Sequence, residues 1–171
     1  VGLSLKRPLN EWLFDSGYRV DLWLGPQASD LGTNDSSDSA VAIRQAFIDL
    51  RIPLADPRNA GWAQSVDLRL GTFDSPLGFE STDRTLNNHY THSWGYSIEP
   101  TVHTGLLAMY PGVDALENGE SDFLLSLGVA NSVDPRINGA PANDDRKTFL
   151  SGLTWLMPNQ FDVLGGTALS V

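Results

Sequence analysis

The chain has 171 residues, enough to bury the core of one domain, and a formal net charge of −10. That charge argues against nucleic acid as a partner, because binding a phosphate backbone needs clustered lysine and arginine. The absence of cysteine excludes a disulfide scaffold, a thiolate metal site and a cysteine nucleophile.

Most of the chain consists of segments in which apolar and polar residues alternate, and no segment sustains the 3.6-residue period of a helix. Strands are expected at residues 1–8, 12–25, 41–52, 62–73, 99–111, 121–130, 148–157 and 160–171. Side chains on a strand point to opposite faces with period two, so Val66 and Leu68 lie opposite Asp67. Each strand therefore separates two different environments, and the sequence predicts an all-β, antiparallel, hairpin-connected fold.

The connections between these strands alternate strictly between short and long. Short connections are expected at 8–10, 53–61, 111–120 and 158–159, and long ones at 26–39, 74–97 and 131–147. Outer-membrane barrels alternate in this way, with short periplasmic turns and long external loops, whereas a soluble sandwich has no reason to do so. The alternating runs also reach about ten residues, the length that spans a bilayer at barrel tilt. These patterns favour an up-and-down transmembrane β-barrel.

Several short motifs occur along the chain: Arg44-Gln45-Ala46-Phe47, Leu70-Gly71-Thr72-Phe73, Pro76-Leu77-Gly78-Phe79, Tyr90-Thr91-His92-Ser93, His103-Thr104-Gly105 and Met109-Tyr110-Pro111. These motifs resemble those of the OmpL-like β-barrel porins, the β-barrel porin-2 family. The resemblance spans most of the chain. It implies an outer-membrane barrel of Gram-negative-type bacteria that conducts small solutes.

The porins of this family are considerably longer than 171 residues, and the chain begins and ends inside strand-like patterns. We therefore expect residues 1–171 to be a single β-barrel segment that is incomplete at both ends. It would form an arc of about eight strands from a larger barrel, because an eight-stranded barrel would be filled by its own side chains.

Charged residues gather on one face of the predicted strands. Facing lipid, each would cost roughly 2–4 kcal/mol at the bilayer midplane, so this face is expected to line the lumen. In a watery pore the charges would set a transverse field for passing solutes, and the alternative is a mutually neutralising ladder without selectivity. The expected pore-lining residues are Arg19, Asp21, Gln45, Asp49, Arg51, Asp67, Arg69 and His103.

Beyond residue 99 the same face loses its charges and becomes small and partly apolar, with several glycines that permit curvature. We expect the loop at 74–97 to fold onto this wall and narrow the pore, because its aromatic side chains are costly to leave in water. The alternative is an external loop that caps the rim or contacts another subunit. The candidate constriction residues are Phe79, Asp83, Arg84, Tyr90, Trp94 and Tyr96.

Metal and catalytic chemistry lack supporting motifs. His89, His92 and His103 do not have the spacing of a closed zinc site. The acidic loop around Asp35 lacks the central glycine and terminal glutamate of an EF-hand. No nucleophile elbow, phosphate loop or HExxH motif occurs, so we expect no enzyme activity, metal or cofactor.

The sequence thus predicts an outer-membrane channel for passive diffusion of small hydrophilic solutes or ions, in contact with lipid and not with nucleic acid. It leaves a homo-oligomer open. Two alternatives also stay open: a secreted carbohydrate-binding β-sandwich with Tyr90, Trp94 and Tyr96 as a sugar platform, and a plugged barrel that acts as an anchor or adhesin.

Overall fold

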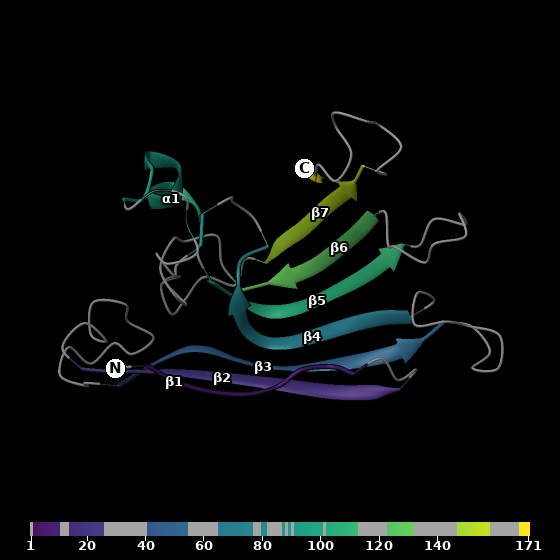
Figure 1. Cartoon of the computed structure of the whole chain (residues 1–171), viewed down its shortest axis with the longest axis horizontal. Coiled ribbons are helices and arrows are strands. Elements are labelled where there is room, and N and C mark those ends of the chain that lie inside the picture. Colours follow the sequence, from purple (N-terminus) through teal and green to yellow (C-terminus); the bar gives the residue numbers. More distant parts are fainter. Residues whose placement is uncertain are drawn as a thin grey trace.

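The strands of the protein form one antiparallel sheet in which neighbours in sequence are neighbours in space, from β1 to β8. The computed structural model describes residues 2–10, 14–25, 41–54, 65–76, 80–81, 87, 89, 91–100, 102–112, 123–131, 147–157 and 168–171. The strands are β1 (Gly2–Arg7), β2 (Asp15–Leu24), β3 (Val41–Pro53), β4 (Ser65–Asp74), β5 (Val102–Gly112), β6 (Phe123–Ala130), β7 (Thr148–Leu156) and β8 (Ala168–Ser170). Figure 1 shows a curved sheet, with β1–β3 seen nearly edge-on and β4–β7 turned towards the viewer. The predicted all-β antiparallel fold is confirmed.

The central strands are long for a soluble sheet. β2 and β4 have 10 residues each, β3 has 13 and β5 has 11, against about five or six in a typical soluble sheet. The strand ends that flank 25–40, 75–101 and 131–147 lie at one end of the sheet, on the left in Figure 1. The strand ends that flank 8–14, 54–64, 113–122 and 157–167 lie at the other end. Long and short connections therefore join strands at opposite ends of the sheet, as the alternation predicted.

The pairing runs in sequence from the β1–β2 ladder to the β7–β8 ladder. In the described part of the chain, no ladder joins β1 to β8. An arc of a larger barrel, completed by further strands, stays a prediction.

The two faces of the sheet differ as the alternation predicted. The outward side chains of Leu50, Leu70 and Leu127 are 41%, 52% and 53% exposed. The inner face carries a buried apolar cluster of Phe47, Phe73, Leu107, Ala130 and Leu150, with Met109 packed against it. An exposed apolar band of this kind over successive strands marks a surface that meets lipid or another protein.

Two glycines allow the sheet to bend between its halves. Gly71 has a φ of +133°, and a Cβ added to it would lie 2.2 Å from the Ala46 carbonyl oxygen. A Cβ on Gly105 would lie 2.1 Å from the carbonyl oxygen of Val129. Gly71 and Gly105 are direct partners in the β4–β5 ladder. Only glycine permits such close backbone approach, and glycine kinks of this kind produce sheet curvature.

The expectation of no helix is wrong at one place, where α1 (Trp94–Ile98) forms a single helical turn. The Ser93 hydroxyl caps this turn by accepting a hydrogen bond from the Tyr96 N–H at 3.3 Å. Five residues are too few to display a 3.6-residue period, which is why periodicity missed the turn. No helix among the described residues has the length and apolar character needed to cross a membrane.

Candidate pore wall

Two bidentate ion pairs connect β3 to β4 on the inner face. Asp49 lies directly opposite Arg69, and Arg51 opposite Asp67. Arg69 Nε and Nη2 lie 2.8 and 3.0 Å from the two Asp49 oxygens, and Arg51 Nε and Nη2 each lie 2.7 Å from an Asp67 oxygen. The Arg69 guanidinium also lies over the Phe47 ring, 4.1 Å from its centroid. Charge-assisted forks of this geometry are among the stronger polar contacts in proteins.

A β-bulge in β3 adds a further arginine to this face. The ladder pairs Asp21 with Gln45 and Leu22 with Ile43, so Arg44 is the extra residue. Arg44 and Gln45 are consequently both buried, at 8% and 2% exposure. A bulge re-aims a side chain, and here it brings two successive polar side chains to the inner side.

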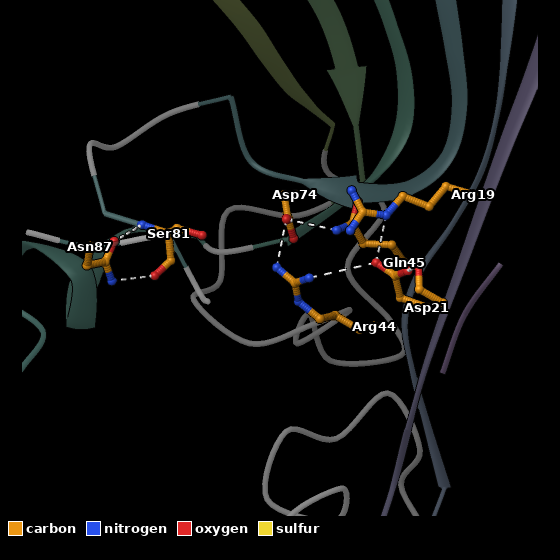
Figure 2. A network of polar contacts seen from close by, with 8 residues as sticks. Arg19, Asp21, Arg44, Gln45, Asp74, Ser81 and Asn87 are labelled. Atoms are coloured by element: carbon orange, nitrogen blue, oxygen red, sulfur yellow. Dashed lines mark hydrogen bonds and ion pairs between the residues drawn. The ribbon is translucent and has the colours of Figure 1, made fainter. Parts of the chain in front are cut away.

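These side chains form a network with the end of β4, shown in Figure 2. The Arg44 Nη2 and Gln45 Nε2 atoms donate to Asp74 Oδ2 at 2.7 and 2.8 Å. Arg44 Nη1 also lies 3.8 Å from Asp21, which pairs with Arg19 Nε at 2.8 Å. Strict alternation would place Asp74 outward, so β4 changes its side-chain direction at its last residue. The network holds the point where β4 ends and the longest connection begins.

The residues expected to line the pore come together on β2–β5, but not all of them present surface. Asp21, Gln45 and His103 are buried, at 5%, 2% and 1% exposure. His103 lies opposite Phe73, which is fully buried. The Arg19 side chain, by contrast, is 40% exposed. Their role in lining a pore stays a prediction.

The inner face of β5–β7 has a different chemistry. Gly105 lies opposite Ala130, and Leu107 opposite Gly128. A Cβ on Gly128 would lie 3.0 Å from Leu107 Cδ1, so the leucine lies flat over the glycine. Leu107 is 3% exposed and packs in the apolar cluster with Phe73 and Leu150. This half of the inner face, the neutral wall, consists mainly of small residues and of leucines that pack against them.

The candidate constriction loop is described only in part. Phe79, Asp83, Arg84 and Tyr90 lie outside the described residues. Trp94 is 84% exposed, so its ring does not supply the packing on the neutral wall that we expected. Tyr96 stacks on His92, with ring centroids 3.8 Å apart.

Within this loop, Glu80 fastens the start of α1. Its carboxylate accepts the Ser93 N–H at 2.9 and 3.1 Å and lies 3.2 Å from His92 Nδ1. The pKa of Glu80 lies below its usual range, mainly because its carboxylate accepts hydrogen bonds from Ser93. A hydrogen bond from His92 and the charge of His92 lower it further. A second contact within the loop joins Asn87 to the backbone of Ser81. The Asn87 Oδ1 atom accepts from the Ser81 N–H, and the Asn87 Nδ2 atom donates to the Ser81 carbonyl oxygen. Of the described histidine, aspartate and glutamate residues, no three gather as a metal site would require.

Arg44 and Asp74 were not among the residues expected to line the pore. A signal for both was present, because strict alternation puts them on the lipid-facing side with Ala46 and Leu70. An arginine there would cost roughly 2–4 kcal/mol at the midplane, and an aspartate or a position near the interface would cost less. An arginine at a lipid-facing position of a strand therefore indicates a bulge, and an aspartate at a strand end indicates a change of side-chain direction.

An up-and-down antiparallel sheet of long strands, with charges on its inner face and exposed apolar side chains outside, defines the class of membrane β-barrels. Residues 3–168 match the protein-family model described as "Putative beta-barrel porin-2, OmpL-like". The chain belongs to this family, which gives it a general porin-like, channel-forming role. No curated protein and no solved structure matches the chain significantly.

Proposed function

We propose that the protein is an outer-membrane porin through which small hydrophilic solutes or ions diffuse passively. The observation that carries the proposal is the contrast between the two faces of one sheet. Ion pairs such as Asp49–Arg69 lie on the inner face, while Leu50 and Leu70, beside them in sequence, are exposed on the other. Water on one side and lipid on the other satisfy both faces at once.

The family supports a place in the outer membrane of a Gram-negative-type bacterium. By the usual orientation of such barrels, the end with connections 25–40, 75–101 and 131–147 would be extracellular. Solutes would pass the paired charges of β2–β4 on one side and the neutral wall of β5–β7 on the other. We expect no catalytic step.

Of the two alternatives, the β-sandwich lacks its second sheet, because the described strands belong to a single one. The plugged anchor shares the fold with a porin and differs only in conductance. The separating experiment is therefore electrical.

The full-length protein is reconstituted into a planar lipid bilayer, and the current is recorded in KCl. A porin gives stepwise, ohmic increases in conductance as single barrels insert. Insertion without conductance, with membrane insertion verified by detergent partition, would identify a plugged barrel instead.

We further propose that part of the loop at 74–97 narrows the pore. The support is the anchorage of Asp74 to Arg44 and Gln45 on the inner face, at the root of that loop. Deletion of residues 81–93 in the full-length protein should then raise the single-channel conductance. Unchanged conductance would place the loop outside the lumen.

A further inference from the structure

The charges of β2, β3 and β4 are balanced residue by residue, and β1 adds Lys6, opposite Arg19 on the same face. Each charged side chain of β2, β3 and β4 has an ion-pair partner on β1–β4. The pairs are Arg7–Asp15, Arg19–Asp21, Arg44–Asp21, Arg44–Asp74, Arg51–Asp67 and Arg69–Asp49. This set of arginines and aspartates has no net charge, although the whole chain carries −10.

The balance depends most on one contact. The Asp74 side chain is 40% exposed, whereas those of Asp49 and Asp67 are each 14% exposed. Asp74 therefore presents more side-chain surface than the aspartates of the β3–β4 pairs, although its Oδ1 atom is buried and its Oδ2 atom accepts from Arg44 and Gln45. The cation that neutralises it is Arg44, at 2.7 Å, and its other hydrogen-bond donor there, Gln45, carries no charge.

Arg44 itself exposes little surface, with 9% of its side chain accessible. It lies against the Trp23 ring, 5.5 Å from the centroid, and reaches towards both Asp74 and Asp21. Arg19 pairs directly with Asp21 at 2.8 Å and reaches Asp74 only through its charge, so loss of Arg44 would leave Asp74 as the less compensated of the two. The bulge in β3 is what places this arginine on the inner side.

We propose that Arg44 determines the ion preference of the pore, by neutralising Asp74 at the end of the wall where the long connections lie. With Arg44 in place, the wall discriminates little between small cations and small anions. This inference rests on the proposed channel function. A unit charge about 10 Å from an ion in water changes the ion's local concentration about twofold, in opposite senses for cations and anions. Exposing one such charge should therefore change the cation-to-anion permeability ratio about fourfold.

The test measures reversal potentials of the full-length protein in planar bilayers under a KCl gradient near 0.01 M, where a Debye length of about 30 Å leaves most of this interaction unscreened. Arg44→Gln should raise the permeability ratio of K⁺ over Cl⁻ about fourfold, and Arg44→Lys should stay near the wild type. The double variant Arg44→Gln/Asp74→Asn should return to the wild-type ratio. Asp74→Asn alone should shift the ratio towards Cl⁻, which keeps the test decisive if Arg44→Gln does not fold.

Lys147→Gln is the matched control. Lys147 is exposed, hydrogen-bonds to Asn131 and immediately precedes β7 at the same end of the sheet. Lys147→Gln removes one positive charge, as Arg44→Gln does, but not from the set of ion pairs on β1–β4. The permeability ratio of K⁺ over Cl⁻ should therefore change less in Lys147→Gln than in Arg44→Gln. An equal shift, or an unchanged ratio in Arg44→Gln and Asp74→Asn, overturns the inference while leaving the channel function intact. Absence of conductance in the wild type overturns both.

Discussion

The inner face of this sheet is built in two ways, and β4 is where they meet. Between β2 and β4 the face consists of arginines and aspartates paired across strands, as in Asp49–Arg69. Between β5 and β7 small and apolar residues predominate, as in Leu107 over Gly128, with no arginine or carboxylate among the described inner-face positions. β4 forms ionic pairs with β3 and a glycine–glycine pair with β5.

The two halves of the inner face are stabilised by two different kinds of interaction. In the charged half each side chain extends to a partner, so stability depends on groups that are present. In the neutral half, glycines allow the backbones to approach closely and leucines pack beside them. Stability there depends on the lack of a Cβ at the glycines and on the packing of the leucines. Substitutions should therefore act differently in the two halves.

The largest effect is expected where a side chain is added to the junction. Gly71→Ala combines a positive φ with a Cβ placed 2.2 Å from the Ala46 oxygen, and backbone cannot move aside as a side chain can. The strain and overpacking together should cost about 2–6 kcal/mol. Urea unfolding of the full-length protein in lipid vesicles measures this cost. Gly152→Ala is the control, because its Cβ would have 3.8 Å to the nearest atom; equal losses would contradict the account of the junction.

The neutral half can be tested with two adjacent leucines on β5. Leu107 is 3% exposed on the inner face, and Leu106 is 44% exposed on the outer face. Leu107→Ala should destabilise the full-length protein by about 2–5 kcal/mol, since it leaves a cavity in the packed wall. Leu106→Ala removes the same atoms from the exposed face and should cost less in the same unfolding assay. Reversal of that order would show that the faces are assigned wrongly.

Substitutions in the charged half should lower the free energy of unfolding by less, and the effects of substituting two paired residues should be coupled. Arg69→Gln leaves Asp49 without its bidentate partner and should cost about 1–3 kcal/mol. Because the two residues contact each other, the cost of Arg69→Gln/Asp49→Asn should differ from the sum of the single costs by about 0.5–3 kcal/mol. A double-mutant cycle by urea unfolding gives this coupling energy. Strict additivity would mean that the pair is not formed.

The smallest effect concerns the loop that connects the two halves. The lowered pKa of Glu80 means that its hydrogen bonds to Ser93 stabilise the loop fully above the ordinary pKa of 4.5. This contribution is lost as the pH falls below that value and through the lower pKa of the folded state. Hydrogen exchange of the Ser93 amide should be slower in the wild type than in Glu80→Gln at pH 7. The difference should vanish at low pH, and a difference that persists there would exclude Glu80 as its cause.

Much of the fold follows from period-two alternation. It assigned Leu50 and Asp49 to opposite faces, and the order of strands followed from the lengths of the connections. The helical turn at α1 was not predicted, because five residues cannot show a helical period. Of the strand expected at 160–171, the structure describes β8 at Ala168–Ser170, and residues 158–167 lie outside the described part.

The candidate wall was predictable where the strands are regular and not where they depart from regularity. Asp67 and Arg69 follow directly from alternation. The position of Arg44 depends on a bulge, and that of Asp74 on the change of side-chain direction at the end of β4. Both departures are set by pairing with another strand, which a single strand's pattern does not contain. The burial of His103 opposite Phe73 is likewise a property of the folded sheet.

The central claim is that one face of the sheet meets water and the other meets lipid, and β4 allows the most direct test. The 171 residues contain no cysteine, so single cysteines can be introduced at successive positions once any cysteine elsewhere in the full-length protein has been replaced by serine. Val66→Cys, Asp67→Cys, Leu68→Cys, Arg69→Cys and Leu70→Cys are each reconstituted in the full-length protein in lipid vesicles and treated with a charged, water-soluble thiol reagent. The account predicts reaction at 67 and 69 and protection at 66, 68 and 70. Equal reactivity along the strand would contradict it.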